Sequence, residues 1–224
     1  MLSFFKDYKI FAIVFGVISI VIVSIIYNTL NVYKPLPIYQ PTMVSTELVD
    51  STIQYKKKYH TIADFSLTNQ NGKIITHNDY KDKIYIADFF FTTCQTICPI
   101  MTNHMVEIQE EITNDTDVLL LSHSVTPEID SVAQLKRYAL KKGVNDKKWN
   151  LVTGDKKEIY KLARKSYLAV KDNGDGGPFD MVHTENFMLI DKKRQIRGFY
   201  DGTNKDDIKR LLADIETLKE EYLQ

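Results

Sequence analysis

The chain has 224 residues, of which 44% are hydrophobic and 26% are charged, as is typical of a globular protein with room for one domain plus an anchor or tail. Lysine and arginine together number 29, as do aspartate and glutamate, so the formal net charge is zero. This balance gives no reason to expect nucleic acid as a partner. We interpret the lysines at 56–58 as part of a solvated linker.

Residues 10–27 form an apolar run of 18 residues without a charged side chain. A helix needs roughly 17–25 apolar residues to cross a bilayer, so this run is long enough. Lys6 and Lys9 precede it and the next basic residue is Lys34, so the positive-inside bias puts residues 1–9 in the cytoplasm. A cleaved signal peptide is the alternative, but no small-residue cleavage site follows the run. We therefore predict a retained single-pass anchor in the cell membrane, with the soluble part on the extracytoplasmic (periplasmic) side.

The segment after the anchor, residues 28–58, contains Pro35, Pro37 and Pro41 and shows little periodicity. We interpret it as a stalk that lifts a folded domain off the membrane. The domain itself is expected to cover residues 59–224.

The domain opens with a hairpin pattern, in which short segments at 65–68 and 73–76 flank the turn sequence Asn69-Gln-Asn-Gly72. Apolar patterns then predict strands at 83–91, 117–125, 149–152, 187–191 and 195–200. Helices are predicted at 97–112, 127–142, 155–166 and 204–222, with a glycine-rich loop at 173–178. Parallel strands joined by helices and closed by an antiparallel hairpin make a mixed α/β sheet with flanking helices.

Cys94 and Cys98 are the only cysteines, and they lie where the predicted strand 83–91 meets the predicted helix 97–112. The dipole at a helix N-terminus favours the thiolate, which is the form that attacks disulfides and binds soft metals. A structural disulfide across so short a loop would add little stability, so redox or metal chemistry fits better. A cysteine pair between a central strand and a helix is the thioredoxin-like arrangement. The predicted fold is therefore a thioredoxin-like mixed sheet with flanking helices and an N-terminal hairpin, preceded by one transmembrane helix.

Five histidines are candidates to join the cysteine pair. Four are expected elsewhere: exposed (His60 and His77), turned away from the cysteines on their helix (His104), or in the core (His123). His183 follows the glycine-rich loop, and in a thioredoxin-like sheet that loop lies beside the cysteines. Two thiolates and one imidazole are a ligand set well suited to copper, so we prefer a ligand role for His183 over a structural one.

Three stretches resemble the Sco/SenC family: Thr93-Cys-Gln-Thr-Ile-Cys-Pro99, Ser124-Val-Thr-Pro-Glu-Ile-Asp130 and His183-Thr-Glu-Asn-Phe-Met-Leu-Ile-Asp191. The resemblance implies a membrane-anchored, thioredoxin-like protein that assists assembly of the binuclear copper centre of cytochrome c oxidase. It implies a copper ion, Cu(I) or Cu(II), with Cys94, Cys98 and His183 as its ligands. The implied partner is the copper-bearing subunit of the oxidase or another extracytoplasmic cysteine protein.

Three positions depart from the pattern usual in that family. Gln95-Thr96 stands between the cysteines in place of Pro-Asp, Thr126-Pro127 stands in place of Asp-Pro, and Val182 stands where an Asp often precedes the histidine. The implied ligands are retained while nearby carboxylates are lost, which predicts altered tuning of the ion or altered docking of the partner.

Three functions are compatible with the pair. In the first, the protein is a metallochaperone rather than an enzyme, and it passes copper on by ligand exchange. In the second, it is a thiol–disulfide oxidoreductase in which Cys94 attacks and Cys98 resolves. In the third, the pair is only a structural staple. We expect the first, with reductase activity as a compatible alternative.

A methionine pair and an aspartate near the cysteines could be either structural residues or parts of the site. Met101 and Met105 lie at helical spacing and are expected in the core rather than as additional sulfur ligands. Asp88, in the strand before the cysteines, is expected to be buried with a shifted pKa or paired, and from there it could assist proton transfer.

Overall fold

The computed structural model describes residues 8–30, 35–45, 49, 52–170, 177 and 180–223. It divides into two compact units, Met1–Pro35 and Leu36–Gln224. In the first unit, helix α2 (Lys9–Leu30) contains a window, Lys9–Ile26, with a mean hydropathy of 2.8 and no buried residue. By length and composition this helix can cross a membrane, as predicted for residues 10–27. Lys6 and Lys34 lie outside the described residues, so the orientation of the span stays a prediction.

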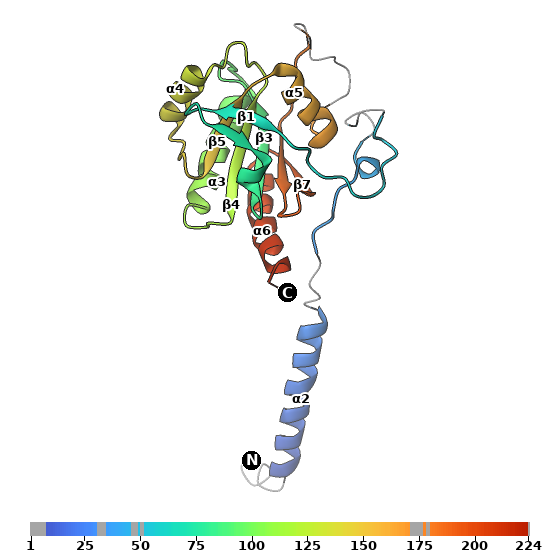
Figure 1. Ribbon diagram of the computed structural model, residues 1–224. Coiled ribbons are helices and arrows are strands. Elements are labelled where there is room, and N and C mark those ends of the chain that lie inside the picture. The colour runs from blue at the N-terminus through green and yellow to red at the C-terminus, as the bar shows by residue number, and fades with distance from the viewer. Residues whose placement is uncertain are drawn as a thin grey trace. The chain divides into compact units, whose positions relative to one another are not determined.

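The second unit is built on a seven-stranded mixed sheet with the strand order β2-β1-β5-β4-β3-β6-β7 (Figure 1). Strands β3, β4 and β5 run parallel, and the other neighbouring pairs are antiparallel. The strands are β1 (Ser66–Asn69), β2 (Ile74–Thr76), β3 (Ile84–Phe90), β4 (Val118–Ser124), β5 (Trp149–Thr153), β6 (Asn186–Ile190) and β7 (Ile196–Asp201). The predicted thioredoxin-like sheet is confirmed, and so are both predicted hairpins.

Helices cover both faces of this sheet. They are α3 (Ile97–Glu111), α4 (Val132–Lys142) and α6 (Lys205–Glu221) on one face, and α5 (Lys156–Lys161), continued by a π-helical turn (Leu162–Ser166), on the other. Side chains of the central strand β3 point alternately to the two faces of the sheet. Ile86 and Phe90 pack on the face covered by α3, whereas Tyr85 and Phe89 pack on the face covered by α5. Because successive side chains of a strand point to opposite faces, a strand buried on both is apolar throughout, and this pattern made β3 predictable.

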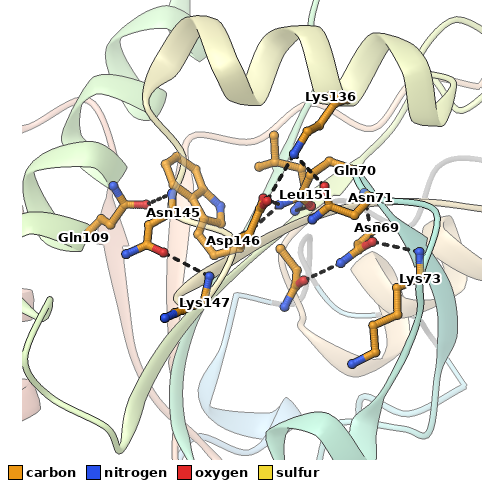
Figure 2. Close-up of polar contacts among 12 residues, drawn as sticks. Asn69, Gln70, Asn71, Lys73, Gln109, Lys136, Asn145, Asp146, Lys147 and Leu151 are labelled. Atoms are coloured by element: carbon orange, nitrogen blue, oxygen red, sulfur yellow. Dashed lines mark hydrogen bonds and ion pairs between the residues drawn. The ribbon is translucent and has the colours of Figure 1, made fainter.

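A polar network fixes the turn of the N-terminal hairpin to β5 and α4 (Figure 2). The Gln70 side chain donates to Asp146 Oδ1 at 2.8 Å and accepts from the Leu151 backbone amide at 2.9 Å. Lys136 of α4 donates to Asn71 Oδ1 at 2.6 Å and to Asp146 Oδ2 at 3.1 Å. Side-chain amides therefore anchor the turn where backbone pairing with the sheet has ended.

Part of the segment predicted to be a stalk, residues 28–58, packs against the domain. The Leu36 amide donates to Glu221 Oε1 at 2.7 Å, and the Leu36 carbonyl accepts from Arg197 Nη2 at 2.7 Å. The Tyr39 amide donates to a β7 carbonyl at 2.8 Å. At residues 36–39 the segment is therefore not a free stalk, because the buried Arg197 takes the Leu36 and Pro37 carbonyls as acceptors.

Two sequence predictions need correction, and a third concerns residues that the structure does not describe. The helix predicted from residue 127 begins only at Val132, where the Ser131 hydroxyl accepts from the Gln134 amide. His60 is buried rather than exposed, because its Nε2 lies 2.7 Å from the Ser166 carbonyl, while His77 is half-buried. The predicted loop at 173–178 lies, apart from Gly177, outside the described residues.

Candidate metal and redox site

The cysteine turn joins the carboxyl end of β3 to the N-terminus of α3. Strand β3 ends at Phe90 and α3 begins at Ile97, so Cys98 is the second residue of the helix and Cys94 lies in the turn before it. Both cysteines are free; Cys94 is half-buried, whereas Cys98 is 3% exposed. The strand–turn–helix context predicted for the pair is confirmed.

The two thiols differ strongly in acidity. Partial burial raises the pKa of Cys94, but hydrogen bonds from the Thr96 hydroxyl, the Cys98 and Thr96 amides and the Cys98 thiol outweigh it and lower the pKa to about 7. The Thr96 Oγ1 lies 3.5 Å from the Cys94 sulfur. Burial is the main cause that raises the pKa of Cys98 to about 12. Near neutral pH the thiolate of the pair therefore forms at Cys94, the more accessible sulfur, while Cys98 stays protonated.

A buried carboxylate, Asp130, braces the turn next to Cys94. Four donors reach it: the Thr92 hydroxyl at 2.5 Å, the Thr92 amide at 3.2 Å, the Ser124 hydroxyl at 2.6 Å and the Thr126 hydroxyl at 3.1 Å. Thr92 stands two residues before Cys94. This network explains why residues 126–130 form a turn rather than the first turn of α4, since their hydroxyls and carboxylate serve the cysteine turn. The sequence signal for Asp130 was only its place at the end of the second family-like stretch.

His183 lies beside the cysteine turn. Its side chain is exposed, and its ring packs edge-on against Phe91 with ring centroids 5.7 Å apart. The Phe91 carbonyl accepts from the Cys94 amide at 3.3 Å, so the imidazole and the first cysteine share a neighbour. No group of three His, Cys, Asp or Glu side chains that could hold a metal ion occurs among the residues that the structure describes.

The remaining candidates near the site are structural. His104 points away from the cysteines, with Nδ1 2.7 Å from a backbone carbonyl at the end of β7. His123 is fully buried and stacks on Phe89 with centroids 4.8 Å apart. Met101 and Met105 are fully buried in the core. These positions agree with the predictions for all four residues.

Asp88 is 2% exposed and lies in β3. Burial raises its pKa to about 7, against the hydrogen bond with Ser122 that favours the carboxylate. A negative charge on Asp88 contributes to the raised pKa of Cys98, so the two groups sense each other electrostatically. The expected buried, shifted carboxyl group is therefore present behind the cysteines.

A family model described as SCO1/SenC matches residues 53–220. The SCO1 protein homolog of Bacillus subtilis is 31% identical over 160 residues, which cover 70% of this chain and 82% of that protein.

Solved structures share the fold and, in part, the sequence. A SCO1/SenC family lipoprotein from Bacillus anthracis matches with a TM-score of 0.64 and 31% identity, covering 71% of this chain and 95% of that one. BsSco, described as a member of the Sco family of cytochrome c oxidase assembly proteins with a disulfide switch, matches with a TM-score of 0.61 and 31% identity, covering 71% and 93%. ScoI of Arabidopsis thaliana, solved with copper bound, matches with a TM-score of 0.55 and 26% identity, covering 69% and 97%. Because the family model matches most of its length, this protein belongs to the SCO1/SenC family.

Proposed function

We propose that this protein binds copper through Cys94, Cys98 and His183 and delivers it to the binuclear copper site of cytochrome c oxidase. The observation that carries the proposal is the cysteine pair at the end of β3, with one thiol of low pKa and an exposed imidazole beside it. It is supported by the copper-bound structure of a relative.

The donor set fits copper chemically. Two thiolates suit Cu(I), and an imidazole is acceptable to both Cu(I) and Cu(II). Cys94 is available as a thiolate near neutral pH, while Cys98 gives up its proton when the ion binds, so loading releases a proton. His183 completes the set. Three protein ligands leave room for an incoming thiolate of the partner, and copper then passes on by exchange of one sulfur for another.

The unequal acidity of the two thiols favours a second activity, thiol–disulfide exchange. The Cys94 thiolate attacks one sulfur of a partner disulfide, the partner S–S bond breaks, and one partner thiolate leaves. Cys98 loses its proton and attacks the Cys94 sulfur of the mixed disulfide, which releases the second partner thiolate. The partner gains two electrons and this pair becomes a disulfide. Reduction of a partner's cysteines in this way would prepare them to receive copper.

Helix α2 provides the proposed membrane anchor, with the N-terminus in the cytoplasm and the copper-binding domain outside. This orientation follows from the lysines before the span. It predicts that external protease removes the domain from spheroplasts. If the domain is cut only after lysis, the orientation is wrong.

The test of the copper proposal is a titration of the reduced full-length chain in detergent, beside Cys94→Ser and His183→Ala. One copper per chain, with thiolate-to-Cu(II) charge-transfer bands that both variants weaken, supports the site. If no copper is retained while both cysteines are needed to reduce a disulfide substrate, the protein is an oxidoreductase and His183 is structural.

A further inference from the structure

The loop that carries His183 is fastened to the domain by a buried ion pair. Arg164 Nη2 lies 2.7 Å from Asp180 Oδ1, and both side chains are 8% exposed. Asp180 stands three residues before His183. Because both side chains of the pair are buried, it holds Asp180 at a defined position on the domain.

Tyr160 provides a second fastening point for the same loop. Its hydroxyl proton is shared between the Val125 carbonyl at 2.9 Å and the Asp180 carbonyl at 3.2 Å, and its oxygen accepts a hydrogen bond from the Val182 backbone amide. The Arg164 guanidinium lies over the Tyr160 ring, 5.4 Å from its centroid. Val182 is itself 3% exposed, so the residue directly before His183 is held in the core.

The backbone around Arg164 is irregular. Arg164 lies in the π-helical turn, in which the Tyr167 amide donates to the Leu162 carbonyl at 2.8 Å. Shortly after it, Leu168 takes a φ of 52°, in the left-handed region that a branched side chain rarely adopts. Both features are frequent at functional sites. The residues that follow Leu168, Ala169 and Val170, line the same pocket as His183.

The ion pair and His183 line one pocket of about 360 Å³ on the surface of the domain. We propose that Arg164 and Asp180, with Tyr160, are positioning residues that hold residues 180–185 at the cysteine turn and thereby set how tightly His183 serves as a copper ligand. The inference rests on the proposed function, since it assigns to His183 the third copper ligand. It adds that the affinity of the site is controlled by contacts that touch neither copper nor its ligands.

The test is a double-mutant cycle on copper affinity in the full-length, reduced chain in detergent. Cu(I) affinity is measured by competition with a chromogenic chelator for wild type, Asp180→Asn, His183→Ala and the double variant. We expect Asp180→Asn to weaken binding about 10- to 100-fold, as loss of a residue that orients a ligand does. Once His183 is absent, Asp180→Asn should cost less than about twofold, because its effect acts through the imidazole.

A second buried ion pair provides the matched control. Asp191 Oδ2 lies 3.1 Å from Arg197 Nη1, with side chains 1% and 5% exposed, and Asp191 follows the end of β6 that is far from the cysteine turn. Asp191→Asn should destabilise the fold while leaving copper affinity within about twofold of wild type. The rate of Cys94 alkylation should be the same in Asp180→Asn and wild type, because neither Arg164 nor Asp180 contacts the thiol.

The outcomes are distinguishable. Asp180→Asn binding copper as tightly as wild type, or losing affinity equally with and without His183, overturns the positioning role while the copper site stands. Wild type and His183→Ala binding copper equally overturns the ligand assignment and with it this inference. Arg164→Lys, which keeps the charge, provides a milder variant if Asp180→Asn does not fold; it should weaken binding only where His183 is present.

Discussion

The low pKa of Cys94 can be tested through a single hydroxyl group. Thr96 lies between the two cysteines, and its Oγ1 is 3.5 Å from the Cys94 sulfur. In Thr96→Val the side chain keeps its size but can no longer donate to the thiolate. The pKa of Cys94 should therefore rise from about 7 toward the value of an ordinary thiol.

The size of the rise follows from the strength of one hydrogen bond. A net contribution of about 0.5–1.5 kcal/mol, divided by 1.36 kcal/mol per pKa unit, gives a rise of about 0.4–1.1 units. Cys94 is half-buried, and screening by water puts the expected rise at the lower end, about half a unit. The thiolate fraction at pH 7 then falls from about one half to about one quarter, so alkylation slows about twofold.

The assay is the rate of iodoacetamide alkylation from pH 5 to pH 9, with the modified cysteine identified by mass spectrometry. Thr93→Val is the matched control, because Thr93 is the exposed threonine directly before Cys94, and its profile should match wild type. A wild-type midpoint near 8.5, or a Thr96→Val profile that coincides with wild type, would refute the assignment of the hydrogen bonds as the cause.

Three further predictions follow from the buried titratable groups. Burial raises the pKa of Asp88 to about 7, so the stability that the protonated side chain contributes is complete below pH 3.8 and is lost as the pH rises through 7. Asp88→Asn should therefore raise the free energy of unfolding by about 2–4 kcal/mol at pH 8.5 and hardly change it at pH 4. Urea unfolding followed by Trp149 fluorescence measures this difference. Burial lowers the pKa of His123 to about 4, so the stability that the neutral ring contributes is complete above pH 6.5 and is lost as the pH falls toward 4. His123→Phe should remove about 3 kcal/mol of this loss of unfolding free energy at low pH. An unchanged loss would contradict the burial of a neutral ring. Since burial raises the pKa of Cys98 to about 12, iodoacetamide at pH 7.5 should modify Cys94 first, and equal labelling of both cysteines would contradict the asymmetry.

Local patterns were sufficient to predict the elements that place the site. The apolar run of β3 is buried on both faces, and the cysteine turn follows it as expected. Helix ends were also readable where one residue defines them: Asp155 caps α5 by accepting from the Glu158 amide, and Gly143 ends α4 with a φ of 72°. In each case the determining contact lies within a few residues along the chain.

Long-range polar contacts could not be predicted from such patterns. His60 is buried because Ser166, 106 residues away in the sequence, provides a carbonyl for its ring. Helix α4 begins later than predicted because Asp130 accepts hydrogen bonds from the turn next to Cys94. The buried partners of a polar side chain are set by the packed fold, and a satisfied buried histidine has the same sequence signature as an exposed one.

The positions of the candidate site residues in the fold were predictable to the same extent. The cysteines were placed by the strand and helix around them, and His183 by the loop before β6. The ion pair of Arg164 with Asp180 was not foreseen, because Arg164 lies in a π-helical turn that no apolar periodicity predicts.

The three-ligand copper site can be tested by the X-ray absorption spectrum of the full-length chain loaded with Cu(I). We expect a copper ion with two sulfur neighbours and one nitrogen neighbour, the nitrogen being lost in His183→Ala and one sulfur in Cys94→Ser. A spectrum with sulfur neighbours only, unchanged by His183→Ala, would contradict the proposed three-ligand site.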